Sequence, residues 1–469
     1  MKETGYKGHV VVLPYPSQGH INPLLQFAKR LASKGVKATL AAPPYVVKTI
    51  CTPNVFVEAV SDGFDEGGFA QAKNETMFLE SFRDNGSTTL SQLIGKFQDT
   101  EFPINCVIYD SFLPWALDVA KQHGIYGAPF FTNSACVTHI FARIYHGLLP
   151  LPIKLEDTPL SIPGLPPLNF PDLPFFVKFP NSYPAYLSMK LSQFSNSDKA
   201  DWIFANTFQE LEGEEARNIA EHWPAKLIGP MVPSAYLDGR MEGDKGYGAS
   251  MWKPLSEESL SWLENKPPRS VVYVSFGSMV SLSEEGMQEM AWGLKESGRH
   301  FLWVVRKSEH EKLPKGFSES TSEQGLIITW CDQLELLAHK ATGCFVTHCG
   351  WNSTLEGLSL GVPMVGIPQW ADQMPDAKYI EEIWKVGVRA KEDEKGVVRR
   401  DEVVKSLKLV MEGESSEVIK QNARKWKHVA KEAVDEGGSS DKVIDDFVHH
   451  LQHANKPGIG KRSALKGQF

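Results

Sequence analysis

One histidine of the chain lies where it could act as a base. His20 belongs to the loop segment SQGHIN (residues 17–22), which follows the β-rich run at residues 9–13. A loop at the carboxyl end of a strand of an open α/β sheet is where such sheets bind ligands, and an imidazole there can remove a proton from a hydroxyl group. A lone loop histidine is more often a polar surface group, so position alone leaves both interpretations open.

A carboxylate follows a second β-rich run. Asp110 ends the sequence CVIYD and is therefore expected at the carboxyl edge of the same sheet. Next to an imidazole, a buried aspartate fixes the tautomer and stabilises the imidazolium that forms on proton uptake. The alternative is that Asp110 only caps the helix after it.

Residues 343–358, GCFVTHCGWNSTLEGL, have the pattern of a buried strand, a turn and a helix that begins near Asn352 or Ser353. The free N–H groups at that helix start predict a diphosphate site that needs no metal. The chain has no G-x-G-x-x-G after a strand and no G-x-x-x-x-G-K-[ST], so the common phosphate fingerprints are absent. The spacing of Ser353 and Glu356 also fits a capping box, which is the competing interpretation.

The surrounding chain alternates between β-rich runs and helical patterns. The runs occupy residues 9–13, 36–41, 55–60 and 106–109 in the first half, and 271–276, 301–305, 326–329, 344–347 and 362–367 in the second. A helix is expected from the pair Asn22-Pro23, because Asn is a good N-cap and Pro a good first helical residue. The alternation predicts an α/β fold of two doubly wound, Rossmann-like domains that face a cleft.

Two irregular stretches interrupt this pattern. Residues 148–184 are rich in proline and aromatic residues, which predicts an ordered wall without long helices. Residues 230–254 are rich in glycine and charge, which predicts an exposed connection that carries the hinge. We expect an N-terminal domain in residues 1–235, a linker in 236–265 and a C-terminal domain in 266–452, whose last helices return to the first domain. Residues 453–469 are expected to form a tail.

Composition excludes several classes of protein. The net charge of −8 provides no basic field for nucleic acid, and no apolar run is long enough for a membrane span or a signal peptide. We expect a cytoplasmic monomer. The six cysteines lack the spacing of a disulfide framework and should be reduced and mostly buried. A metal site at Cys344, His348 and Cys349 is disfavoured, because no second ligand pair lies nearby.

A longer motif contains the predicted diphosphate site. Residues 330–373, WCDQLELLAHKATGCFVTHCGWNSTLEGLSLGVPMVGIPQWADQ, closely resemble the signature box of plant UDP-glycosyltransferases without a gap. The chain is also similar to that family from PYPSQGHINP, which begins at Pro14, to DEGGSSDK, which ends at Lys442. The resemblance implies the GT-B architecture, an inverting reaction with UDP-glucose as donor, no cofactor and no metal.

The resemblance also implies roles for individual residues. His20 is the base and Asp110 its partner. Trp330 stacks on uracil, Cys331 contacts it through the backbone, and Gln333 and Glu356 hold uridine hydroxyls. The residues implied for the diphosphate are Ser278, His348, Asn352 and Ser353, and those implied for the sugar are Trp351, Asp372 and Gln373. Met374-Pro375-Asp376 departs from the family, whose members tend to have a Thr-Asn pair after the Asp-Gln.

The acceptor site is expected in the N-terminal domain. Aromatic residues there suggest an apolar pocket or simply core, namely Phe112, Phe131, Phe141, Phe175, Phe176 and Tyr183. For acceptor contacts we select Gly19, Phe112, Phe175 and Met279. The sequence is nearest to the plant group that acts on small acids, phenolics, triterpenes and steroids, and we favour a steroid or terpenoid, with a phenolic or small carboxylic acid as the alternative.

Other functions fit less well. A hydrolase would need a nucleophile such as G-x-S-x-G, which is absent. A retaining glycosidase would need two close carboxylates, for which nothing in the motif is suited. A catalytically silent small-ligand binding protein remains a further alternative, although it would have no need of the His20–Asp110 pair.

Overall fold

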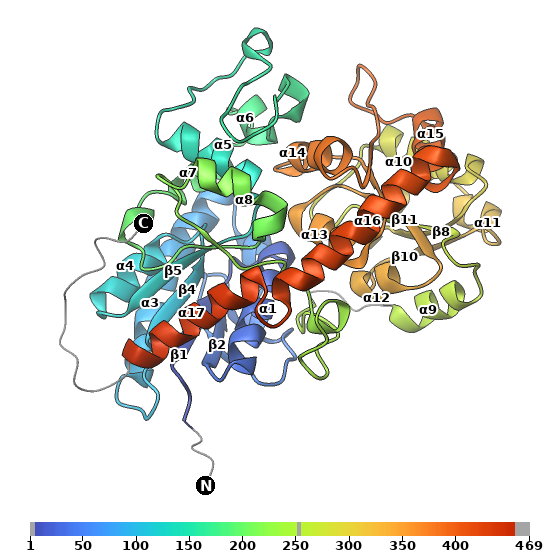
Figure 1. Cartoon of the computed structure of the whole chain (residues 1–469). Coiled ribbons are helices and arrows are strands. Elements are labelled where there is room, and N and C mark those ends of the chain that lie inside the picture. Colours follow the sequence, from blue (N-terminus) through green and yellow to red (C-terminus); the bar gives the residue numbers. More distant parts are fainter. Residues whose placement is uncertain (1–4, 251–254, 455–469) are drawn as a thin grey trace.

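Two parallel β-sheets form the centres of two lobes in the computed structural model, which describes residues 5–250 and 255–454 (Figure 1). The first sheet has the strand order β3-β2-β1-β4-β5-β6-β7. Its strands are β1 (His9–Leu13), β2 (Lys37–Ala42), β3 (Phe56–Ala59), β4 (Cys106–Asp110), β5 (Tyr126–Phe131), β6 (Phe204–Ala205) and β7 (Lys226–Leu227). The strand order reverses between β1 and β4. The carboxyl ends of these two strands are therefore a topological switch point, where α/β sheets bind ligands.

The second sheet has the order β10-β9-β8-β11-β12-β13. Its strands are β8 (Val271–Ser275), β9 (His300–Val304), β10 (Gly325–Ile328), β11 (Thr342–Thr347), β12 (Met364–Gly366) and β13 (Gly387–Arg389). Every β-rich run predicted from the sequence is a strand. Strands β5, β6, β7 and β13 were not predicted. The two doubly wound sheets confirm the predicted fold class.

Helices cover both faces of each sheet (Figure 1). In the first half they are α1 (Gln18–Ser33), α2 (Pro44–Val47), α3 (Glu75–Phe97), α4 (Trp115–Gln122), α5 (Ala135–Tyr145), α6 (Phe175–Lys178), α7 (Pro184–Ser192) and α8 (Gln209–Asn218). In the second half they are α9 (Ser256–Glu264), α10 (Glu284–Glu296), α11 (Phe317–Ser320), α12 (Gln333–Ala338), α13 (Trp351–Leu360), α14 (Gln373–Lys378), α15 (Arg400–Met411), α16 (Gly413–Val434) and α17 (Ser439–Ala454). No helix within residues 5–250 and 255–454 is long and apolar enough to cross a membrane.

The sequence of β1 explains its central place. All five residues of HVVVL are buried, as expected for a strand of a parallel sheet covered on both sides. Val10 and Val12 pack with α1 and α17, whereas Val11 and Leu13 pack with α3 and α4. The pleat thus divides one apolar run between two cores.

The last helix lies on the first lobe. Figure 1 shows α16 running from the second lobe toward the first and α17 lying across the first. Phe447 of α17 packs against Phe204 of β6, with ring centres 5.1 Å apart, and Lys34 of α1 pairs with Asp441 of α17 at 2.7 Å. Burial of an apolar side chain such as that of Phe447 contributes about 1.5–3 kcal/mol to stability. Helix α17 thus holds the end of the described chain on the first sheet. The predicted tail lies almost entirely beyond the described residues.

The prediction for the first helix was wrong at its start. Helix α1 begins at Gln18, with Ser17 as N-cap, so His20 lies in its first turn and Pro23 inside it. The expected start after Asn22 rested on proline's preference for the first helical position. Proline is tolerated one turn later because its missing N–H costs only the bond to residue i−4, here Gly19.

Candidate active site

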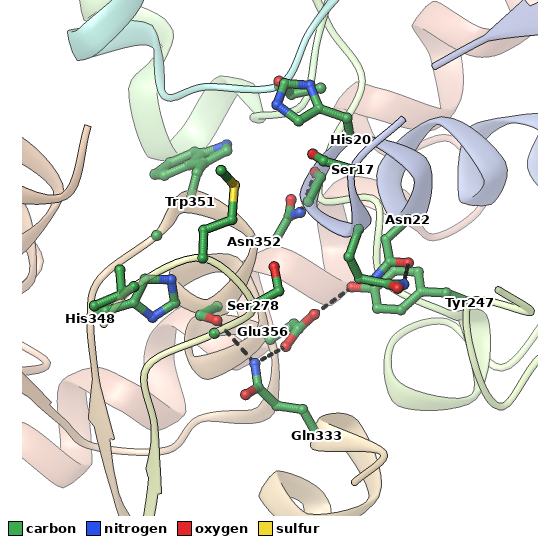
Figure 2. A pocket seen from close by; sticks show the side chains of 18 of the residues that line it. Ser17, His20, Asn22, Tyr247, Ser278, Gln333, His348, Trp351, Asn352 and Glu356 are labelled. Carbon is green, nitrogen blue, oxygen red and sulfur yellow. Dashed lines mark hydrogen bonds between the residues drawn. The ribbon is translucent and has the colours of Figure 1, made fainter. Parts of the chain in front are cut away.

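A cavity of about 490 Å³ lies between the lobes and is lined by the carboxyl ends of both sheets. Figure 2 shows His20 and Ser17 at one end of this space and Gln333 and Glu356 at the other. Strand pairing accounts for the arrangement. Leu13 of β1 lies beside Tyr109 of β4, and Thr347 of β11 lies beside Ser275 of β8. The residues that follow these four positions therefore meet in one space.

His20 and Asp110 form a hydrogen-bonded pair, although 90 residues separate them. Their Nδ1 and Oδ2 atoms are 2.6 Å apart, and Asp110 is fully buried. The other carboxylate oxygen of Asp110 accepts the backbone N–H of Phe112 at 3.0 Å, which fixes the orientation of the carboxylate. An aspartate that accepts from Nδ1 leaves Nε2 free to take a proton from a ligand. The alternative that Asp110 caps the next helix is wrong, because the N-cap of α4 is Pro114.

Aromatic rings surround the His20 imidazole. The ring centre of Phe112 is 4.8 Å from it and that of Tyr15 is 5.5 Å, and the Thr132 hydroxyl approaches Nδ1 at 3.2 Å. His20 nevertheless lines the cavity and retains partial exposure. The imidazole is therefore held by its neighbours on one side and open to the cavity on the other.

The opposite wall is built around the start of α13. Gly350 is its N-cap and Trp351 its first residue, so free backbone N–H groups point toward the cavity. His348 lies below this turn, and its Nδ1 has no hydrogen-bond partner among the described residues. A side chain at Gly277 or Gly350 would come within 2.8 or 2.6 Å of the imidazole. Burial lowers the pKa of His348 to about 4, so the ring is neutral near pH 7.

Ser278 lies in the neighbouring turn after β8. It lines the cavity, and its backbone carbonyl accepts from the Arg306 guanidinium, which also holds Val280. Arg306 thus fixes the turn from outside. Sequence analysis missed this role because it depends on a contact across 28 residues.

Glu356 is bound by two side chains from different segments (Figure 2). Gln333 donates to Oε2 at 2.6 Å and also contacts the Ser353 hydroxyl at 3.0 Å, while the Tyr247 hydroxyl donates to Oε1 at 2.7 Å. The capping-box alternative for Ser353 and Glu356 is wrong, because α13 begins two residues before Ser353 and the Glu356 carboxylate points into the cavity wall. Burial raises the pKa of Glu356 to about 7, although the bonds from Gln333 and Tyr247 oppose the shift.

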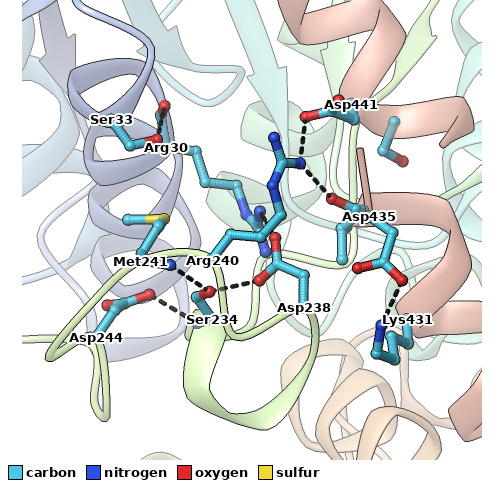
Figure 3. A network of polar contacts seen from close by, with 12 residues as sticks. Arg30, Ser33, Ser234, Asp238, Arg240, Met241, Asp244, Lys431, Asp435 and Asp441 are labelled. Atoms are coloured by element: carbon cyan, nitrogen blue, oxygen red, sulfur yellow. Dashed lines mark hydrogen bonds and ion pairs between the residues drawn. The ribbon is translucent and has the colours of Figure 1, made fainter. Parts of the chain in front are cut away.

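Tyr247 belongs to the connection between the lobes, which is tied to the first lobe by polar contacts (Figure 3). Asp244 pairs with Lys29 and accepts from Gln26 at 2.7 Å, and Asp238 pairs with Arg30 at 3.1 Å. The sequence predicted an exposed connection here, and that is wrong for this part of it. These charges find partners on α1, which is why they are buried.

Trp330 and Cys331 extend the wall beyond Gln333. Both line the cavity, and Trp330 is half-buried. The Tyr273 hydroxyl lies 3.3 Å from the Cys331 sulfur and donates to the Gln333 side-chain oxygen at 3.1 Å. The ring of Tyr273 therefore orients the amide that contacts Glu356.

Asp372 and Gln373 line the cavity between its two ends. The Gln373 side-chain oxygen accepts the backbone N–H groups of Gln369 and Trp370, both at 2.8 Å, so its NH₂ group is what it can offer a ligand. Asp376, part of the unusual Met-Pro-Asp, is outside the cavity lining. It accepts from the Ser134 hydroxyl of the other lobe at 2.8 Å.

Two side chains of α13 reach the first lobe. The Asn352 amide donates to the backbone oxygen of Gly19 at 2.6 Å, and the Trp351 indole N–H donates to that of Asn206 at 2.7 Å. Trp351 is 3% exposed, so its ring serves the interface as well as the cavity wall.

Only some of the residues expected at the acceptor pocket line the cavity. Gly19, Phe112, Phe176 and Met279 line the cavity, and Met279 is 57% exposed. Phe175 lies outside the lining and packs instead on Phe179 and Tyr183, because neighbouring residues of a helix point about 100° apart. Phe131 and Phe141 are core residues with at most 1% exposure.

Further residues of this wall were not predicted. They are Tyr15, Thr132, Asn133, Tyr186, Met189 and Lys190. None lies in a recognisable motif, although the position of Thr132 and Asn133 after β5 would have been a signal had that strand been predicted. Among the described residues, no group of three His, Cys, Asp or Glu side chains is placed to hold a metal ion.

Comparison with known families agrees with this geometry. Residues 211–433 match the family model "UDP-glucoronosyl and UDP-glucosyl transferase", and residues 7–52 match "Glycosyltransferase, N-terminal domain". UDP-glycosyltransferase 74B1 of Arabidopsis thaliana is 51% identical over 451 residues, which is 95% of this chain and 98% of that protein. A Mogroside I-E synthase of Siraitia grosvenorii is 46% identical over 95% of this chain and 98% of its own length.

Solved structures share the two-lobed arrangement. Os79 from O. sativa in complex with UDP superposes with a TM-score of 0.90 at 39% identity, over 94% of this chain and all of the other. A second structure of Os79, with U2F and trichothecene, gives a TM-score of 0.86 at 38% identity with the same coverage. The two sheets of this chain therefore have the GT-B arrangement of those glycosyltransferases.

Proposed function

The chain belongs to the plant UDP-glycosyltransferase family and uses a UDP-sugar donor, and we propose that it transfers glucose from UDP-glucose, with inversion, to a hydroxyl or carboxyl group of a small apolar acceptor. The observation that carries the proposal is the His20–Asp110 pair, which faces the start of α13 across one cavity. That arrangement joins a base to an anion-binding helix start.

In the proposed reaction, His20 Nε2 removes the proton of the acceptor hydroxyl as its oxygen attacks the anomeric carbon. The bond from that carbon to the UDP oxygen breaks on the opposite face, so the configuration inverts. Asp110 stabilises the imidazolium that results, because its buried carboxylate is 2.6 Å from Nδ1. For a carboxyl acceptor, which is already ionised near neutral pH, the base has less to do.

The donor would lie along the second lobe. Uracil stacks on Trp330 and meets the Cys331 backbone, and the ribose hydroxyls donate to Glu356 beside Gln333. The diphosphate lies at the start of α13, near Ser278, His348, Asn352 and Ser353. This assignment is supported by the cavity lining, which includes all of these residues. Trp351, Asp372 and Gln373 would then face the sugar.

For the acceptor we favour a steroid or terpenoid over a phenol or small acid. The apolar wall formed by Phe112, Phe176 and Met279 supports a large apolar molecule. Related proteins bear the names Mogroside I-E synthase and Flavonol 7-O-beta-glucosyltransferase, so both classes occur among relatives. A catalytically silent binding protein is disfavoured because it would not need the His20–Asp110 pair.

We also propose the organisation inferred from the sequence, with acceptor binding in residues 1–235, a linker in 236–265 and donor binding in 266–452. The positions of the two sheets support it. A monomer in the cytoplasm fits the proposal, and the six unpaired cysteines support a reducing compartment.

The test is to incubate the protein with UDP-glucose and a panel of sterols, terpenoids, phenols and carboxylic acids, and to identify products by mass spectrometry and NMR. A β-glucoside is expected, since the donor carries an α linkage. UDP binding without any glucoside would favour the silent binding protein, and an α-glucoside would refute inversion.

A further inference from the structure

Lys190 is a buried cation in the wall of the cavity. It lies near the end of α7, is 6% exposed and lines the same space as His20. Its ammonium donates to the Asn133 side-chain oxygen at 2.9 Å. No carboxylate of the described residues lies within 4.0 Å of it, which is the distance of an ion pair.

The surroundings of this ammonium leave a donor unused. It has three N–H donors, of which Asn133 takes one, and Nζ lies 4.6 Å from the centre of the Phe112 ring, close enough for a cation–π contact. A buried ammonium with an unmade hydrogen bond is costly unless a ligand completes it. Burial lowers the pKa of Lys190, whereas Asp372, Asp110 and Asp376 oppose that shift.

Its position relates it to the base. The His20 ring lies 4.8 Å and Lys190 Nζ 4.6 Å from the centre of the same Phe112 ring, so the two groups are less than about 10 Å apart. One acceptor molecule can therefore present a hydroxyl to His20 and a second oxygen to Lys190.

The carboxylates near Lys190 indicate whether the acceptor oxygen that binds its ammonium is charged or neutral. The carboxylates of Asp110 and Asp372 both stabilise the charged form of Lys190. Asp372 lines the cavity and Asp110 lies behind His20, so an anionic acceptor would meet more negative than positive charge. A neutral carbonyl avoids this repulsion and still accepts a hydrogen bond. We propose that Lys190 selects acceptors that carry a ketone or lactone carbonyl on the skeleton that bears the nucleophilic hydroxyl.

This inference rests on the proposed glucosyl transfer and defines its acceptor class. The experiment uses two hydroxysteroids that differ only in a ketone remote from the hydroxyl, one with C=O and one with CH₂. With UDP-glucose, the protein should prefer the ketone by about tenfold or more in kcat/KM, because the CH₂ analogue leaves the ammonium without its acceptor. Lys190→Met keeps the length of the side chain but removes its donors, and should bring the ratio close to one.

Controls separate this role from a structural one. Lys199→Met, which changes an exposed lysine shortly after α7, should leave the ratio as it is. Lys190→Arg, which retains donors and charge, should keep part of the preference. Calorimetric UDP binding checks that each variant is folded.

Equal kcat/KM for both steroids in the unaltered protein, or equal losses for both in Lys190→Met, would overturn the role of Lys190 while leaving glucosyl transfer demonstrated. Absence of glucoside from every acceptor tried would instead overturn the proposed function.

Discussion

Asn352 and Gly19 join the two lobes at the turn of α1 that carries His20. The Asn352 side-chain amide donates to the Gly19 backbone oxygen at 2.6 Å, and Gly19 immediately precedes His20. Within α1, the residue that would normally donate to this oxygen is Pro23, which has no N–H. The proline inside the helix therefore leaves an acceptor that the second lobe satisfies, and this contact positions His20 relative to the start of α13.

Replacement of Asn352 tests this contact. Asn352→Asp keeps the shape but cannot donate when ionised, and it places a negative charge beside a carbonyl and the proposed diphosphate. We expect it to lower kcat/KM for UDP-glucose more than Asn352→Ala, whose loss of one hydrogen bond should cost roughly tenfold. Asn265→Asp is the matched control, because Asn265 also donates to a backbone oxygen but is exposed. Unaltered kcat/KM in Asn352→Ala would contradict a donor role, and equal losses in the two variants would contradict the added repulsion from Asp.

His20→Ala should lower turnover by roughly 10²–10⁴-fold, as expected for removal of a general base. UDP affinity should be retained, because the proposed nucleotide contacts lie on the other lobe. Steady-state kinetics and calorimetry measure the two effects separately. Turnover like that of the unaltered protein would refute the assignment of the base.

Asp110→Asn should leave the fold intact but favour the wrong tautomer of the His20 imidazole. An amide can donate to Nδ1, which favours the tautomer with hydrogen on Nε2 and so blocks proton uptake there. We expect a larger loss for weakly acidic alcohols than for phenols, which ionise more readily. Turnover of a series of acceptors graded by pKa checks this, and a uniform loss would argue against an orienting role.

Gln373 is expected to discriminate between donors. UDP-glucose should exceed UDP-galactose by at least roughly tenfold in kcat/KM, because the sugars differ at the 4-hydroxyl and an unmatched buried polar group costs about 1–3 kcal/mol. Gln373→Ala should erode the preference, but it also removes the acceptor for Gln369 and Trp370. Gln373→Glu keeps that acceptor but replaces the NH₂ group with a carboxylate oxygen, so it removes the donor and adds a negative charge beside Asp372. A preference retained by both variants would place discrimination elsewhere.

Glu356 should make nucleoside binding dependent on pH. Burial raises its pKa to about 7, so the carboxylate that we propose as the acceptor of the ribose hydroxyls becomes protonated as the pH falls. If only the ionised form binds, affinity for uridine should fall roughly tenfold from pH 8 to pH 6. Uridine is used because it has no phosphate that titrates in this range.

Glu356→Gln should bind uridine more weakly and without this pH dependence. Asp332 also acts on Glu356, so Asp332→Asn serves as a control that should shift the midpoint downward and keep the dependence. Calorimetry across the range measures both. An unchanged pH profile in Glu356→Gln would assign the titration to another group.

The sequence by itself determined the class of fold and much of the cavity wall around the start of α13. Short β-branched runs separated by helical patterns predict parallel sheets, and all nine predicted runs are strands. The signature motif is continuous from Trp330 to Gln373, so its residues could be identified without knowing how distant segments meet.

Only the tertiary structure decided what lies opposite that motif. Lys190, Tyr247 and Arg306 act through contacts between segments far apart in the chain, and no local pattern marks such contacts. The start of α1 was also misjudged, because proline prefers the first helical position but is tolerated here one turn later, where the Asn352 amide satisfies the Gly19 oxygen that Pro23 leaves without a donor.

The same reason explains the acceptor wall. Phe175 and Phe176 are identical in type and adjacent in sequence, yet only Phe176 lines the cavity. The hydrophobicity of an aromatic ring predicts that it will be buried. The orientation of α6 decides which neighbours each ring packs against. Sequence thus determined the chemistry available to this protein, and packing between its lobes decided which side chains face the reaction.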